Sequence, residues 1–147
     1  MEGAWGQPAT LFPRLAGRWR IAREIGRTAS LQGEAVFAQG ADGALRYRES
    51  GRLLLVSGNE LEAERHYIFR AAPDGFAVFF AEPPHALFHE IALRVEEGTL
   101  TGEAAHDCQP DNYLSRYLFA PDGSFTVRHR VTGPRKDYES VTVYRRV

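Results

Sequence analysis

Apolar and polar residues alternate along short stretches of this chain, and turn-forming residues separate the stretches. The turns contain Gly, Asp or Pro, as in "GADGA" (40–44), "APDGF" (72–76), "EEGT" (96–99) and "APDGS" (120–124). Alternation with a period of two is typical of strands that bury one face, and Asp-Gly supplies the backbone conformation of tight hairpins. The pattern therefore predicts an antiparallel all-β protein.

The spacing of the turns predicts about ten strands, with a short N-terminal helix in "TLFPRLAG" (10–17). The predicted strands are 18–26, 30–39, 44–56, 62–71, 75–82, 86–96, 99–108, 112–120, 124–132 and 137–146. Short strands joined by hairpins must cover their edges, and closing the sheet into a barrel does so most completely. We therefore predict one domain, residues 1–147, folded as a closed antiparallel up-and-down β-barrel. A flat sandwich is the competing architecture.

Several motifs resemble known families. Gly17-Arg18-Trp19 opens the first predicted strand, and it resembles the Gly-x-Trp opening of lipocalins and their calycin relatives. In those proteins the Trp plugs one barrel end, so the resemblance implies a lipocalin/calycin-like barrel with a small-molecule pocket. The stretches "GRWRIAREI", "FHE", "HDCQPDNY" and "GPRKDYESVTVYRR" together resemble domain-of-unknown-function family 6314. That resemblance covers nearly the whole chain and implies no activity.

Side-chain parity assigns residues to the two faces of each strand, because successive side chains point to opposite sides. By this test His89, His106 and His129 fall on inward positions of three different strands. Arg23 and Glu49 also turn inward. The predicted lumen is therefore aromatic and apolar, with titratable groups set among the hydrophobic residues.

Titratable groups on the inner face of a barrel need partners, since a buried ion without one costs several kcal/mol. Water or a polar ligand would supply those partners, so the sequence predicts an occupied interior rather than a packed one. The alternative is that Arg23 and Glu49 form one structural ion pair while the histidines bond to tyrosine hydroxyls. The residues expected to contact a ligand share inward positions. They are Trp19, Arg23, Glu49, Tyr67, Phe69, His89, His106, Tyr113, Tyr117 and His129.

The segment around the single cysteine raises the question of metal binding or catalysis. His106 and Cys108 lie two residues apart on one strand, so both point to the same side, and His89 from the neighbouring strand could complete a zinc site. No Cys-x-x-Cys or His-Glu-x-x-His motif accompanies them. Candidates for catalysis are His89, His106, Cys108, Tyr113 and His129. The cofactor stays unknown, and no motif supports haem.

Composition limits the classes of partner and the cellular location that the sequence predicts. A formal net charge of −1 argues against nucleic acid, which needs a basic excess. No apolar stretch approaches the length of a membrane span, and the N-terminus does not resemble a secretory signal. A lone cysteine cannot form an internal disulfide. These features together favour a cytoplasmic protein.

The sequence therefore predicts a lipocalin-like barrel whose interior binds a small molecule that is partly lipophilic or aromatic and compatible with an anionic group. The alternative function is a small barrel enzyme, an acid–base isomerase, cyclase or hydratase, which uses the inward histidines with or without zinc. A homodimer through an outer sheet face is a further, purely structural alternative.

Overall fold

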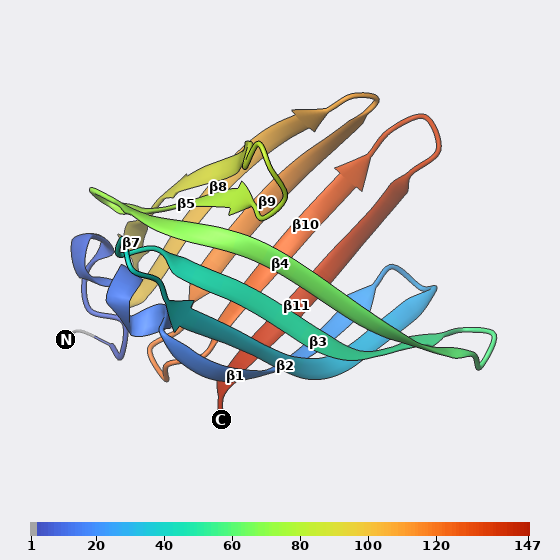
Figure 1. Ribbon diagram of the computed structural model, residues 1–147, viewed down its shortest axis with the longest axis horizontal. Coiled ribbons are helices and arrows are strands. Elements are labelled where there is room, and N and C mark those ends of the chain that lie inside the picture. The colour runs from blue at the N-terminus through green and yellow to red at the C-terminus, as the bar shows by residue number, and fades with distance from the viewer. Residues whose placement is uncertain (1–2) are drawn as a thin grey trace.

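The structure is a computed structural model that describes residues 3–147, and it is almost entirely antiparallel β-sheet (Figure 1). Two short 3₁₀ helices, η1 (Pro8–Thr10) and η2 (Phe12–Leu15), precede the sheet. The strands are β1 (Gly17–Ile25), β2 (Ala29–Gln39), β3 (Leu45–Leu55), β4 (Glu60–Ala72), β5 (Gly75–Phe80), β6 (Leu87–Ala92), β7 (Arg94–Glu96), β8 (Thr99–Cys108), β9 (Asp111–Phe119), β10 (Phe125–Thr132) and β11 (Asp137–Arg146). Neither helix is long and apolar enough to cross a membrane, as far as residues 3–147 show.

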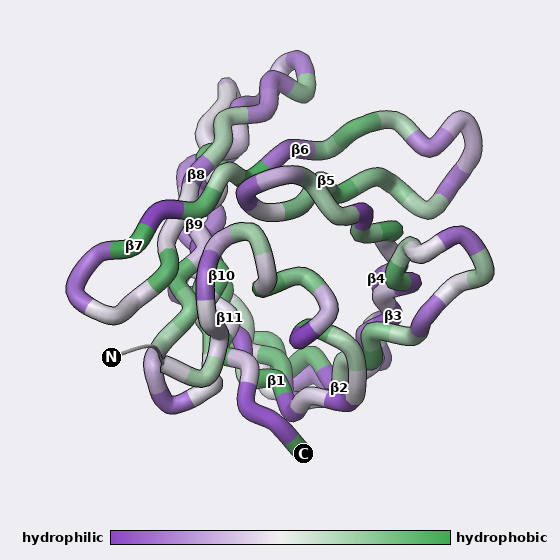
Figure 2. Tube along the Cα trace, turned by 90° about the vertical axis from the view of Figure 1, so that its left-hand side faces the viewer, coloured by the Kyte–Doolittle hydropathy of each residue, from purple (hydrophilic) through white to green (hydrophobic). Residues whose placement is uncertain are grey.

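All strands belong to one sheet with the order β6-β5-β4-β3-β2-β1-β11-β10-β9-β8-β7. Strands that follow one another in sequence are therefore neighbours in space, and the pairing of β1 with β11 joins the two halves. Viewed from the end that holds the N-terminal segment, the strands run round a ring in which β6 comes close to β8 (Figure 2). This is a nearly closed up-and-down barrel of eleven strands, as the alternation predicted in outline.

The seam lies between β6 and β7, which are consecutive in sequence but do not pair with each other. The side of β6 approaches β8 instead, so closely that a Cβ on Gly102 would lie 2.5 Å from the carbonyl oxygen of Ala92. Glycine at this position lets the two backbones meet without a side chain between them. The expectation of a fully closed barrel is therefore wrong at this seam. The predicted strand 86–96 is likewise two strands, interrupted at Leu93.

Aromatic side chains fill the end of the barrel next to the N-terminal segment. Trp5 and Trp19, both buried, stack with ring centroids 5.7 Å apart, and Phe125 meets Trp19 edge-on at 5.0 Å. The indole N–H of Trp19 donates to the carbonyl of Leu15 at 2.9 Å, which ties η2 to β1. Trp19 therefore plugs this end, as its Gly-x-Trp context predicted. The predicted N-terminal helix is present as the two 3₁₀ turns that cover the plug.

Candidate ligand-binding site

A polar network occupies the deep part of the barrel, just beyond the plug. The guanidinium of Arg23 donates two hydrogen bonds to Glu49, at 2.6 and 2.9 Å, and a third to the hydroxyl of Thr142 at 2.6 Å. Tyr47 donates to Glu49 at 2.5 Å, and its hydroxyl lies 2.7 Å from that of Tyr144. All five side chains are buried, and each finds its partner within the network.

These contacts determine which groups of the network are ionised at neutral pH. Burial alone would raise the pKa of Glu49, but the hydrogen bonds from Arg23 and Tyr47 hold it below its usual range. Burial beside this carboxylate raises the pKa of Tyr47 well above its usual value and that of Tyr144 to about 12. At neutral pH the network is therefore one ion pair with two neutral phenols, and its formal charges cancel.

The void beside this network measures only about 30 Å³, the room of one or two water molecules. Its walls include several of the residues predicted to contact a ligand, namely Arg23, Glu49, Tyr67, Phe69, Tyr117 and His129. The prediction of an unpacked interior is therefore wrong for the deep half of the barrel. There the structural ion pair, which the sequence left as the alternative, fills the space.

Two of the inward histidines are also held by hydroxyl groups. The Nε2 atom of His89 lies 2.9 Å from the hydroxyl of Tyr117, and the Nδ1 atom of His129 lies 2.7 Å from that of Ser115. Burial lowers the pKa of His89 to about 3, and the nearby imidazoles of His129 and His106 add to the shift. Burial also lowers the pKa of His129 to about 4, where the charges of Arg65 and Arg23 add to the shift and Glu49 opposes it. Both imidazoles are neutral at pH 7. Nδ1 of His89 has no partner in the described part of the chain.

A larger cavity, of about 200 Å³, lies at the opposite end from the plug, where the β8–β9 and β10–β11 hairpins extend past the barrel (Figure 1). We call it the mouth cavity. Residues from eight strands surround it, and they combine aromatic and apolar walls with imidazole, hydroxyl and guanidinium groups. They are Ile25, Arg65, Tyr67, Phe80, Phe88, His106, Cys108, Tyr113, His129, Val131, Tyr138 and Ser140.

Arg65 is the charged group of this cavity. It lies opposite Glu49 in the β3–β4 ladder, yet Glu49 is already paired with Arg23. Arg65 forms no salt bridge or side-chain hydrogen bond with any residue between 3 and 147, and its side chain is exposed. Its charge contributes to the lowered pKa of both Glu49 and His129. The mouth cavity therefore carries a guanidinium with unused donors.

Phe88 is the residue of this site that parity reasoning missed. The β5–β6 ladder pairs Val78 with His89 and Phe79 with Leu87, so Phe88 is the extra residue of a β-bulge. The bulge turns Phe88 inward next to His89, and both side chains are buried. The ring of Phe88 then packs at centroid distances of 5.1 Å from Phe80 and 5.3 Å from His106, and at similar distances from Tyr67, Tyr113 and His129. Phe88 lines both the deep void and the mouth cavity.

The other predicted site residues lie at different depths within the barrel. Trp19 belongs to the plug, and His89 lines neither the void nor the mouth cavity. Of the five catalytic candidates, the other four line the mouth cavity. They are His106, Cys108, Tyr113 and His129. Their roles in binding or catalysis stay predictions.

The zinc alternative finds no support in the geometry. Between residues 3 and 147, no three His, Cys, Asp or Glu side chains are grouped closely enough to hold a metal ion. Cys108 is exposed near the end of β8, whereas His89 is buried against Tyr117. The set His89, His106 and Cys108 is therefore not brought together as a metal centre.

Comparisons with known proteins identify the family and leave the activity open. A family model described as "Family of unknown function (DUF6314)" matches residues 15–146. Among solved structures, a redesigned β-barrel, mFAP0, bound to DFHBI is 10% identical, with a TM-score of 0.43 over 90% of this chain and 99% of that one. EF1p2_mFAP2b bound to DFHBI is also 10% identical, with a TM-score of 0.46 over 92% and 96%. No curated protein sequence matches.

Proposed function

We propose that this chain, which belongs to the DUF6314 family of unknown function, binds one small aromatic monoanion in its mouth cavity. The observation that carries the proposal is Arg65, a guanidinium at the rim of an aromatic cavity with no side-chain partner among residues 3–147. Guanidinium groups form strong, charge-assisted hydrogen bonds with carboxylates. Arg65 would hold the acidic group, and the rings below it would hold the body of the molecule.

The charge of the lumen favours one negative charge on the ligand. Arg23 and Glu49 neutralise each other, and His129 has a pKa of about 4, which leaves it uncharged at pH 7. Arg65 therefore supplies the net positive charge of the inner face near the mouth. A dianion would leave one charge without a partner, and a neutral molecule would leave Arg65 without its acceptor.

The walls favour a flat body of one or two rings. Phe80 and Phe88 stack at 5.1 Å on one side, and Ile25 and Val131 line the same cavity. A volume of about 200 Å³ is below the usual range for drug-sized ligands, about 300–1,000 Å³. The hydroxyls of Tyr113 and Tyr138 offer further hydrogen bonds at the rim.

Four isoleucines make this site directly observable. Ile25 lines the mouth cavity and Ile68 lies on the outer face, while Ile21 and Ile91 are fully buried in the core. A sample labelled at the isoleucine δ1-methyl groups would be titrated with 1-naphthoate and separately with the neutral 1-naphthamide. We expect 1-naphthoate to shift the Ile25 signal, and to bind roughly tenfold or more tightly than the amide.

Two arginine variants test the role assigned to Arg65. Arg65→Gln should weaken 1-naphthoate roughly tenfold and leave 1-naphthamide unchanged, because only the charged ligand loses its partner. Arg20→Gln is the matched control, since Arg20 is exposed on β1 and lines neither cavity. The proposal fails if naphthoate and naphthamide bind equally, or if both variants weaken naphthoate to the same extent.

A further inference from the structure

The outer face of the sheet carries a groove of about 730 Å³ across β2, β3, β4 and β5. Many outward positions of this barrel are charged, and several pair across strands, as Arg18 does with Glu34 and Arg128 with Glu139. The floor of the groove is apolar instead, and none of its apolar residues lines the void or the mouth cavity. Its apolar residues are Val36, Ala38, Ile68, Phe79 and Ala81. Tyr47 and Tyr67 also border the groove, and both line a cavity inside the barrel.

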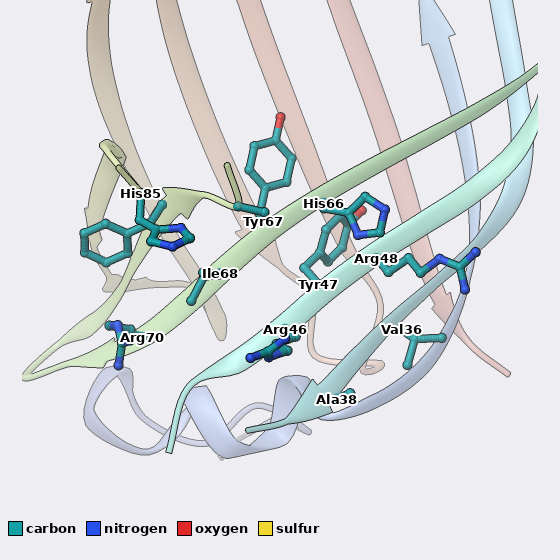
Figure 3. Close-up of a pocket in the computed structure, with 12 residues that line it drawn as sticks. Val36, Ala38, Arg46, Tyr47, Arg48, His66, Tyr67, Ile68, Arg70 and His85 are labelled. Carbon is teal, nitrogen blue, oxygen red and sulfur yellow. The ribbon is translucent and has the colours of Figure 1, made fainter. Parts of the chain in front are cut away.

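Cationic and imidazole side chains rise around this floor (Figure 3). They are Arg46, Arg48, His66, Arg70 and His85. No Asp or Glu is among the residues that line the groove. An apolar floor under a rim of one charge sign is complementary to a molecule with an apolar body and an anionic head.

The ladder places Arg46 at the centre of this rim. Its direct partners across the strands are Ala38 and Ile68, which cannot accept a hydrogen bond from it through their side chains. Arg48 is two residues along the same strand, and His66 and Arg70 are the diagonal neighbours on β4, within about 8 Å.

The flanking arginines have acidic partners, but these carboxylates lie outside the groove. Arg48 pairs with Glu64 at 2.6 Å and Arg70 with Asp42 at 2.9 Å. Arg46 has no such partner within residues 3–147. Arg46 is therefore the arginine of this rim whose charge no carboxylate among the described residues neutralises, and an anion bound there would supply the missing partner.

We propose that this groove is a second binding site, which takes an organic anion on an aromatic body, with a phosphate ester as the best-fitting chemistry. Arg46 would form the bidentate contact, since its planar fork matches phosphate oxygens. Arg48 and Arg70 would keep their carboxylates and contribute remaining N–H groups, because each guanidinium has five donors. Ile68 and Phe79 would pack against the ring.

The test uses 1-naphthyl phosphate, which is close to a dianion at pH 7.5, and 1-naphthol as the uncharged control. In the isoleucine-labelled protein we expect 1-naphthyl phosphate to shift the Ile68 signal, and to bind at least tenfold more tightly than 1-naphthol at low salt. Affinity should fall as salt is added, because the contacts are exposed ion pairs.

Two substitutions locate the site. Arg46→Gln should weaken 1-naphthyl phosphate roughly tenfold, whereas Arg20→Gln, on the outer face of β1, should not. Arg65→Gln should leave the phosphate titration at Ile68 unchanged, so failure of the mouth site and failure of this one give different results. An unmoved Ile68 signal, or equal losses in Arg46→Gln and Arg20→Gln, would overturn the proposal.

Discussion

Lowering the pH from 7 to 5 should destabilise the fold through His89 and His129. The pKa of His89 is about 3 and that of His129 about 4 in the folded chain, against about 6.5 when unfolded. The unfolded chain therefore takes up protons below pH 6.5 that the folded chain cannot accept until nearly pH 4. The stability that neutral histidines provide is present above pH 6.5 and is lost as the pH falls through this window.

The size of the expected loss in unfolding free energy follows from the width of this pH range. One pH unit corresponds to about 1.4 kcal/mol per proton, so 1.5 units cost roughly 2 kcal/mol for each histidine and roughly 4 kcal/mol for both. Urea unfolding followed by the fluorescence of Trp5 and Trp19, both buried in the plug, would measure this loss. With a typical dependence of the unfolding free energy on urea concentration, the urea concentration at the unfolding midpoint should fall by roughly 2 M between pH 7 and pH 5.

A matched pair of variants isolates the cause. Gln at position 129 can still hydrogen-bond to Ser115 but does not titrate, so His129→Gln should remove about half of the pH dependence. The control His66→Gln changes an exposed histidine and should keep all of it. If the midpoint falls equally in the wild type and in His129→Gln, the interior of the barrel admits protons freely and the reasoning is wrong.

Three further predictions concern the packing and access of the lumen. Phe88→Ala should lower the free energy of unfolding by about 3–5 kcal/mol and join the deep void to the mouth cavity, measured by urea unfolding and by binding of larger ring systems. Arg23→Met should cost about 3–5 kcal/mol because it leaves the Glu49 carboxylate buried without its partner, and Arg23→Met combined with Glu49→Gln should recover part of the loss in thermal unfolding. Bound 1-naphthoate should slow alkylation of Cys108 by iodoacetamide, because this exposed thiol lines the mouth cavity; an unchanged rate would place the ligand elsewhere.

The strands and their inward faces were predictable because both depend on local patterns. Turn residues fixed where the strands end, and the period of two placed Trp19, Arg23 and Glu49 on the buried face, where the structure has them. What parity cannot show is whether two inward charges meet. The register that pairs β1 with β2 and β2 with β3 brings Arg23 within reach of Glu49 and fills the deep half of the lumen.

Side-chain parity could not predict the β-bulge at Phe88. A bulge shifts parity by one residue, and it depends on how β6 pairs with β5 rather than on the sequence of β6 alone. The sequence does contain an indication of the outer groove, because the predicted strand 75–82 is apolar on both faces. Phe79 on its outward side forms part of the groove floor. A contiguous exposed apolar patch, such as the one that Phe79 forms with Val36 and Ile68, is typical of a binding surface.

Strand β4 contributes side chains both to the mouth cavity and to the groove on the outer face. Its successive side chains point to opposite faces, so Arg65 reaches the mouth cavity while His66 and Ile68 reach the outer groove, and Tyr67 borders both. The same alternation sets the charge of each site separately, with Arg65 inside and Arg46 outside, and neither has a side-chain partner among residues 3–147. Because Arg65 and Arg46 share no side-chain partner, a substitution of one should change the affinity of its own site alone. Under the two proposals above, separate residues within the same few positions of one hairpin would therefore set the ligand selectivity at the two faces.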